Sequence, residues 1–144
     1  MDISSPDPTP ERTSGVQTVA RLLLGAALVF TGIAHLTVAR DDFQAQVPRW
    51  LPLPLDTVVL ASGIAEITLG AALIALPRRR TLIGMIAAAF FVAIFPGNIS
   101  QYVERIDAFG LESDRARAVR LAFQPLLVLW ALWSTGVLRK VTRK

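Results

Sequence analysis

Four apolar segments, separated by shorter polar ones, dominate the hydrophobic pattern of this chain. They cover residues 16–38, 56–76, 81–99 and 118–138. Each is close to the roughly 20 residues that a helix needs to cross about 30 Å of hydrocarbon. The segments lack the wide polar stripe of a soluble amphipathic helix. The pattern therefore predicts an all-α fold, a four-helix transmembrane bundle that runs up-down-up-down.

The polar segments outside these spans define the rest of the organisation. Residues 1–15 are rich in Pro, Ser and Thr and predict a disordered polar tail. No positively charged stretch precedes the first apolar run, so we expect that run to be a retained span rather than a cleaved signal peptide. Residues 16–138 form one transmembrane domain, and residues 139–144 form a basic C-terminal tail. Three prolines in residues 40–55 predict an interfacial loop without a continued helix.

The placement of charge predicts an orientation in the membrane. The composition is 53% hydrophobic and 18% charged, with a formal net charge of +4. Nine basic residues lie on the side that the two termini share with the loop at 77–80, and six lie on the other side. The positive-inside rule therefore predicts a multi-pass protein of the cell membrane, plasma or inner, with both termini in the cytoplasm. The basic excess also makes anionic membrane lipids an expected partner, whereas no nucleic-acid motif is present.

The scarcity of metal-ligating residues excludes several kinds of redox centre. The chain has no cysteine and a single histidine, His35. Disulfides, thiolate metal sites and bis-histidine haem within one protomer are therefore excluded. We expect no metal site and no intrinsic cofactor.

Glu66 is the first candidate for chemistry, because an acid at the centre of a spanning helix is costly, by roughly 2.5 to 3.5 kcal/mol on insertion scales. In the functional interpretation it is a proton-exchanging carboxyl group. In the structural interpretation it is a protonated acid that hydrogen bonds to a neighbouring helix, for instance through Ser62 or Thr31. Both interpretations stay open on the sequence alone.

His35 is the second candidate, since its imidazole can donate a hydrogen bond to a quinone-like carbonyl or exchange a proton with it. It can equally be an interfacial residue that points to water at the outer rim. Counting about 1.5 Å per residue from the helix ends puts His35 about 5 Å deep and Glu66 about 15 Å deep. The difference of about 10 Å predicts that the two side chains do not touch directly.

Four further polar residues are candidates for binding a ligand in the outer half of the bundle: Ser62, Asn98, Arg120 and Gln124. Polar groups inside a membrane usually face a cavity or another helix. For Asn98 the alternative is a cap on the helix that Pro96 kinks. For Arg120 the alternative is an ion pair with an acid of the outer loop.

The order of these elements resembles the DoxX-like family of small four-helix membrane proteins. The resemblance covers about residues 21–133, and the elements that carry it are Gly32-Ile33-Ala34-His35-Leu36, Val47-Pro48, Leu53-Pro54, Ser62-Gly63-Ile64-Ala65-Glu66, Pro77-Arg78-Arg79-Arg80, Phe95-Pro96-Gly97-Asn98-Ile99, Arg120-Leu121, Gln124-Pro125-Leu126 and Trp130-Ala131-Leu132. Leu36 and Gly97 depart mildly from the family pattern.

The resemblance implies a function in quinone chemistry, because the family is named for a subunit of a thiosulfate:quinone oxidoreductase. On this hypothesis the chain is a quinone-interacting subunit of a membrane oxidoreductase, with Glu66 and His35 handling protons. It has no redox centre of its own, so a redox protein partner is expected, or a homo-oligomer. The alternative is a non-enzymatic scaffold or a four-helix protein that binds lipid or another small molecule.

Overall fold

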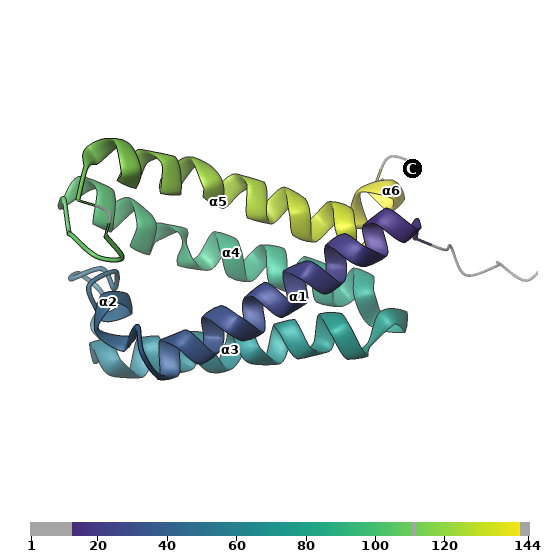
Figure 1. Ribbon diagram of the computed structural model, residues 1–144, viewed down its shortest axis with the longest axis horizontal. Helices are drawn as coiled ribbons and strands as arrows, with labels where there is room; N and C mark the ends of the chain where they lie inside the picture. Colours follow the sequence, from purple (N-terminus) through teal and green to yellow (C-terminus); the bar gives the residue numbers. More distant parts are fainter. Residues whose placement is uncertain (1–12, 111, 142–144) are drawn as a thin grey trace, which may run out of the picture.

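The computed structural model describes residues 13–110 and 112–141, and over these residues it contains helices and no strand. Figure 1 shows four long helices that lie side by side: α1 (Gly15–Leu36), α3 (Leu55–Ala75), α4 (Arg80–Val103) and α5 (Asp114–Ser134). The short elements are α2 (Arg40–Gln44), a 3-10 turn η1 (Pro77–Arg79) and α6 (Val137–Val141). The predicted all-α class is therefore confirmed for the described part of the chain.

Three helical segments in the described residues are long and apolar enough to cross a membrane. They are α1, α3 and the segment Pro77–Val103, which joins η1 to α4. Helix α5 is not among them, because Arg117, Arg120 and Gln124 lower the hydropathy of its N-terminal half. The structure is thus that of a protein with three candidate membrane spans, and the fourth span at 118–138 stays a prediction.

Several boundaries differ from those that the hydropathy predicts. A short helix, α2, lies in the segment 40–55 that was expected to be a loop. Within this segment no proline occurs before position 48, and two acids stabilise the first turn of the helix. Helix α4 continues past Pro96 to Val103. The tail at 1–15 lies mostly outside the described residues. The tail at 139–144 starts inside α6, and its last three residues also lie outside them.

Local sequence explains where α1 and α5 begin and end. Ser14 caps α1 in a capping box with Gln17, which satisfies two free N–H groups at the start of the helix. Ser113 caps α5 by accepting from the Ala116 N–H at 3.2 Å. Gly136 follows α5 at φ 81°, a left-handed conformation that favours glycine at a helix end.

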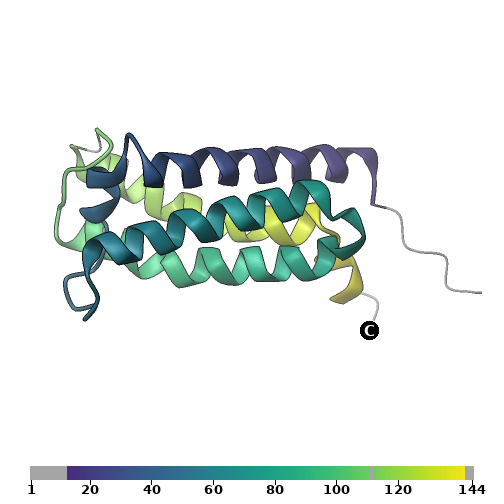
Figure 2. The ribbon, with the colours of Figure 1, turned by 90° about the horizontal axis from the view of Figure 1, so that it is seen from below.

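Glycines allow α1 and α3 to approach very closely. A Cβ atom on Gly32 would lie 2.7 Å from the carbonyl oxygen of Gly63, and one on Gly70 would lie 2.5 Å from that of Gly25. These backbone atoms would have to move apart for any larger residue, as in the small-residue interfaces of membrane helices. Helix α1 therefore packs mainly against α3, while α4 packs mainly against α5, and Figure 2 shows the same arrangement from below.

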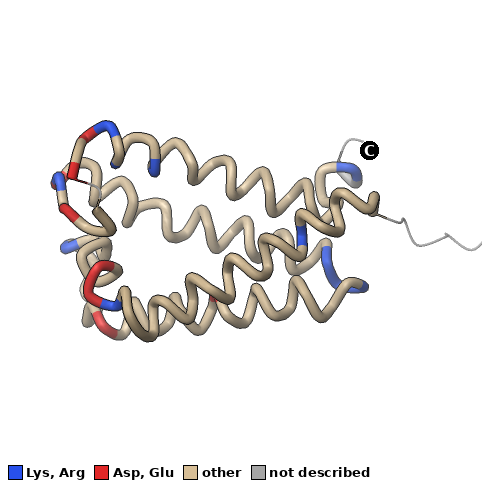
Figure 3. Tube along the Cα trace, viewed as in Figure 1, with Lys and Arg blue, Asp and Glu red and all other residues tan. Residues whose placement is uncertain are grey.

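Side chains near the start of α1 hydrogen bond to the C-terminal ends of α3 and α5. Arg21 donates to the carbonyl oxygen of Leu73 in the last turn of α3, and Gln17 Nε2 donates to that of Trp133 in α5 at 2.8 Å. Both carbonyls belong to last turns that lack partners within their helix. In Figure 3 the described Lys and Arg at this α6 end have no acid among them. The described acids other than Glu66 lie at the opposite end, which we call the α2 end.

Candidate functional site

A cavity of about 950 Å³ lies among the four long helices and reaches toward the α2 end. This volume is typical of sites for small molecules, which span about 300 to 1,000 Å³. Each of the six polar residues that the sequence singled out lines the cavity: His35, Ser62, Glu66, Asn98, Arg120 and Gln124. The structure thus brings together residues from α1, α3, α4 and α5.

His35 and Glu66 face each other across the junction of α1 and α3. The Nδ1 atom of His35 lies 3.1 Å from Glu66 Oε2. The expectation of a 10 Å separation was therefore wrong. Counting from helix ends ignores the stagger between two helices, and the glycine contact between Gly32 and Gly63 brings these turns of α1 and α3 to the same level.

The hydrogen of His35 Nδ1 goes to a different acceptor. Nδ1 hydrogen bonds with the carbonyl oxygen of Thr31 at 2.9 Å. Because a carbonyl oxygen only accepts, Nδ1 is the donor, and Nε2 of the neutral ring is left as an acceptor. This hydrogen bond holds the imidazole of His35 against the preceding turn of α1.

Glu66 is the least satisfied polar group of the cavity. Its side chain is only 7% exposed, and its Oε2 atom is buried without a hydrogen-bond partner. The structural interpretation expects a hydrogen bond to a neighbouring helix, for instance through Ser62 or Thr31. The Thr31 hydroxyl instead donates to carbonyl oxygens of its own helix, at Ala27 and Leu28. A buried oxygen without a hydrogen bond costs about 1 to 3 kcal/mol.

Asn98 and Gln124 form a second polar group on the opposite wall. Asn98 Nδ2 donates to Gln124 Oε1 at 2.9 Å, and Gln124 Nε2 donates to the carbonyl oxygen of Phe91 at 2.7 Å. Phe91 lies five residues before Pro96 and next to Val92, whose carbonyl oxygen would otherwise accept from the N–H group that proline lacks. Asn98 therefore does not cap the helix but links α4 to α5.

Arg120 brings a positive charge to the cavity wall. It donates to Gln46 Oε1 at 3.0 Å, and its guanidinium lies 4.8 Å from the ring centre of Phe109. The expected alternative, an ion pair with an acid of the outer loop, is absent among the residues that the structure describes. Asp107 and Asp114 of that loop pair with Arg117 instead. Arg120 can therefore offer charged donors to a ligand.

Aromatic side chains from α2 and from the loop before α5 line the cavity at the α2 end. The ring of Phe43 stacks on His35 with centroids 3.3 Å apart, and Phe109 meets Phe43 edge-on at 4.6 Å. Phe109 has φ 56°, a left-handed conformation that is uncommon for a bulky residue and persists only where the surroundings hold it. We call Phe43 and Phe109 the aromatic roof.

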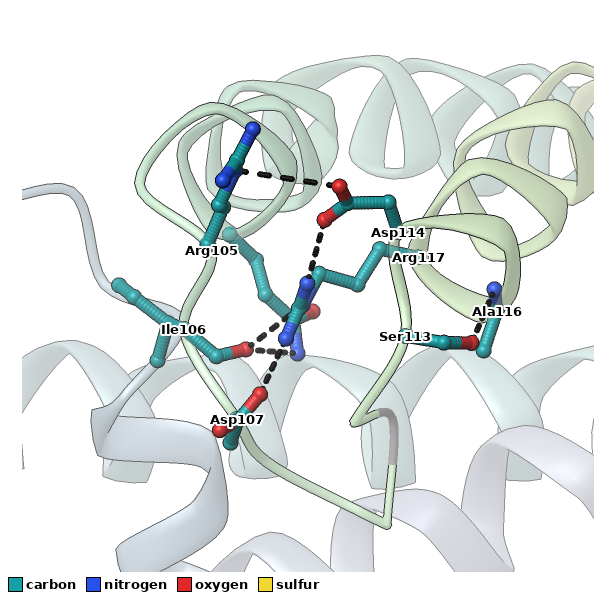
Figure 4. A network of polar contacts seen from close by, with 8 residues as sticks. Arg105, Ile106, Asp107, Ser113, Asp114, Ala116 and Arg117 are labelled. Carbon is teal, nitrogen blue, oxygen red and sulfur yellow. Dashed lines mark hydrogen bonds and ion pairs between the residues drawn. The ribbon is translucent and has the colours of Figure 1, made fainter.

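A polar network holds the loop that carries Phe109. Arg117, 5% exposed, donates to Asp107, to Asp114 and to the carbonyl oxygen of Ile106 (Figure 4). Gln101 Nε2 donates to the same carbonyl oxygen, and Gln101 Oε1 accepts from Gln46. The network therefore connects the loop at the surface to Gln46, the acceptor of Arg120.

The other half of the roof is attached through α2. Arg40 Nε donates to Asp56 Oδ1 at 2.6 Å, and Gln44 Nε2 donates to the same oxygen at 3.0 Å. The hydrogen bond to Asp56 raises the pKa of Arg40 above its ordinary value. Helix α2, and Phe43 with it, is thereby tied to the start of α3.

The sequence did not point to the roof or to its supports. Phe43, Gln46, Gln101 and Phe109 lie in loops or at helix ends, where no hydrophobic period marks a buried position. In the segment 40–55 the sequence signal was its three prolines, which predicted only irregular structure. Over the described residues, no group of three or more His, Asp or Glu side chains is arranged to hold a metal ion.

Fold and site together define the class of this protein: an all-helical protein with three candidate membrane spans and a polar-lined cavity among its long helices. Residues 24–135 match the model of a protein family described as a domain of unknown function, DUF8561, and the chain belongs to this family. No curated protein and no solved structure matches the chain.

Proposed function

We propose that the chain is a four-helix membrane protein in which α5 is the fourth span and both termini face the cytoplasm. In Figures 1 and 2 the long helices lie side by side, and consecutive ones alternate in direction, which supports an up-down-up-down path. Large apolar side chains are exposed along all four, among them Phe30, Ile64, Val92 and Leu126. Such surfaces suit lipid. The basic α6 end supports the cytoplasmic assignment.

The absence of cysteine makes this topology directly testable. Single cysteines are introduced as Arg79→Cys at the α6 end and Arg115→Cys at the α2 end, both at exposed positions. In intact cells, a maleimide that does not cross membranes is expected to label only the second variant. Labelling of the first variant alone, or of both, would contradict the proposed orientation.

We infer that the cavity binds the head group of a quinone, as the resemblance to the DoxX-like family suggests. The observation that carries this proposal is Glu66, a residue of the cavity lining whose buried Oε2 atom has no hydrogen-bond partner. A quinone ring is flat and apolar and has carbonyl oxygens at opposite edges. The cavity matches this chemistry with apolar walls between two polar groups, one from α1 and α3 and the other from α4 and α5.

Each polar group has a distinct role in this proposal. Arg120 donates hydrogen bonds to one carbonyl oxygen of the ring. Glu66 donates to the other when protonated, and accepts from a hydroquinone hydroxyl when ionised. His35 places Nδ1 3.1 Å from Glu66 Oε2, so a protonated His35 stabilises the ionised carboxylate, and its other nitrogen, Nε2, can exchange a proton with the ligand. The aromatic roof keeps bulk water away from this exchange.

Reduction of a quinone consumes two electrons and two protons. In the proposal the electrons come from a redox protein partner, since the chain has no cysteine and only one histidine. His35 and Glu66 deliver the protons. The chain is then the quinone-binding subunit of a membrane oxidoreductase.

Binding of the tailless ubiquinone head group to detergent-purified protein tests the proposal, by calorimetry and thermal shift. Glu66→Gln keeps the shape of the side chain and removes its charge, and it is expected to weaken binding at least tenfold. Glu104→Gln is the matched control, because Glu104 lies at the surface beyond the cavity and pairs with Arg49. No saturable binding to the unmodified protein, or equal binding by the two variants, would refute the proposal.

A second candidate, a scaffold whose polar groups serve helix packing, is favoured by one observation. Asn98 and Gln124 satisfy each other and the Phe91 carbonyl without any ligand. A scaffold role requires that Glu66 is likewise satisfied by neighbouring protein groups without a ligand. The sign of the stability change on replacing Glu66, developed in the Discussion, separates the two candidates.

A further inference from the structure

A second hollow, a groove of about 840 Å³, lies on the outside of the molecule between α1 and α5. Apart from the indole N–H groups of two tryptophans, its lining side chains are apolar, among them Val16, Val19, Leu23 and Leu129. The residues come from the half of each helix that is nearer the α6 end. Five of the larger ones are more than half exposed: Val16, Val19, Leu23, Leu126 and Leu129.

The groove continues the cavity along the same seam between two helices. On α1 the cavity includes Ala27, and the groove takes over one turn earlier at Leu23. On α5 the cavity includes Phe123 and Leu127, and Trp130 lines both hollows. Residues at three- and four-residue steps share one helix face, so cavity and groove form one track.

Trp130 is positioned as an apolar wall at this junction. Its Nε1 donates to the carbonyl oxygen of Ala20 at 2.9 Å, which fixes the indole against α1. With the N–H group satisfied, the rest of the ring offers only apolar surface to an occupant. The polar side chains of the track are therefore confined to the cavity.

The track is divided into a polar part and an apolar part, as an amphiphilic molecule is. Its cavity holds the charged and hydrogen-bonding groups, and its groove offers an apolar channel that is open to the outside of the molecule. From Ala27 to Val16 the channel follows α1 for about 16 Å, at 1.5 Å per residue. A compact head group in the cavity thus leaves room for a linear tail along the groove.

We propose that the groove between α1 and α5 holds the hydrocarbon tail of the quinone whose head group occupies the cavity. The proposal rests on the proposed function and narrows it. The ligand is a quinone with a long isoprenoid or alkyl tail that resides in the membrane, rather than a water-soluble quinone. It enters from the lipid along the seam, because the aromatic roof covers the cavity at the α2 end.

The test compares two valines that are equally exposed. Val19→Trp fills the groove, whereas Val92→Trp places the same bulk on α4 outside both hollows; the two valines are 57% and 59% exposed. The probes are the tailless ubiquinone head group and decylubiquinone, which has the same ring and an alkyl tail. Comparing variants with one probe cancels the partitioning of that probe into detergent micelles.

We expect Val19→Trp to weaken decylubiquinone binding about tenfold, the scale on which pockets discriminate small apolar groups. Binding of the tailless head group stays unchanged, and Val92→Trp alters neither. If Val19→Trp binds decylubiquinone as well as Val92→Trp does, the tail lies elsewhere, and the groove holds only bilayer lipid or a second copy of the chain. Failure of the unmodified protein to bind the head group instead overturns the proposed function, and this inference with it.

A cross-linking measurement on the unmodified protein keeps the test valid if Val19→Trp does not fold. Decylubiquinone with a diazirine at the end of its tail is activated by light, and the labelled peptides are identified by mass spectrometry. Labels are expected at residues 16–23 and 126–133, and excess tailless head group is expected to remove them. Labels spread over all lipid-facing helices, unaffected by the competitor, would overturn the assignment of the groove.

Discussion

Replacing Glu66 by methionine is expected to stabilise the folded protein in the absence of ligand. Methionine matches the length of glutamate and fits apolar surroundings. The substitution removes a buried oxygen that has no hydrogen-bond partner. It leaves no donor without an acceptor, because His35 Nδ1 already donates to the carbonyl oxygen of Thr31.

The size of the effect follows from the cost of the unpartnered atom. A buried polar group without its hydrogen bond costs about 1 to 3 kcal/mol. We therefore expect the free energy of unfolding to rise by about 1 to 3 kcal/mol in Glu66→Met. The same variant is expected to lose binding of the ubiquinone head group. A gain in stability together with a loss of binding is typical of a residue kept for function.

Gln124→Met is the matched control, since it makes the same kind of change at a satisfied residue on the opposite wall. It leaves the Asn98 amide without its acceptor and the Phe91 carbonyl without its side-chain donor. We expect a loss of about 1 to 3 kcal/mol. Unfolding is measured in detergent by titration with a denaturing detergent. If Glu66→Met loses stability as Gln124→Met does, Glu66 is a packing residue and the reasoning fails.

Two further substitutions test the packing and the loop. Gly32→Leu is expected to lower the free energy of unfolding by about 1 to 3 kcal/mol, because the new side chain meets backbone atoms of α3. At Gly15, where an added Cβ meets nothing within 4 Å, the same change should matter little; equal stability of the two variants would contradict the close approach. Arg117→Gln should speed amide hydrogen exchange in residues 104–113, since it breaks the buried network of the loop. Arg105→Gln is the control, because Arg105 is 76% exposed and its ion pair spans 3.8 Å, and it should leave amide exchange in this loop unchanged. Equal protection of the loop in the Arg117→Gln and Arg105→Gln variants would refute the anchoring role of Arg117.

The candidate site was largely predictable because membrane insertion penalises polar residues. Glu66, His35 and Arg120 stood out in apolar surroundings, where a polar group needs a partner or a cavity. The face of the helix on which each residue lies indicated that its side chain turns toward other helices. What they contact was not predictable, because contact depends on the stagger of α1 against α3. The 3.1 Å approach of His35 to Glu66 is the clearest example.

The sequence by itself determined the helical class, three of the candidate spans and the residues that must avoid lipid. These follow from local properties, since hydropathy and helical period act over one or two turns. Only the tertiary structure decided that Phe43 and Phe109 cover the cavity, that Arg117 takes the acids expected for Arg120, and that the cavity continues into the groove along α1 and α5. The roof and the groove depend on how segments far apart in the chain meet. The pairs of Arg117, three and ten residues apart, depend on how the loop before α5 folds back on that helix.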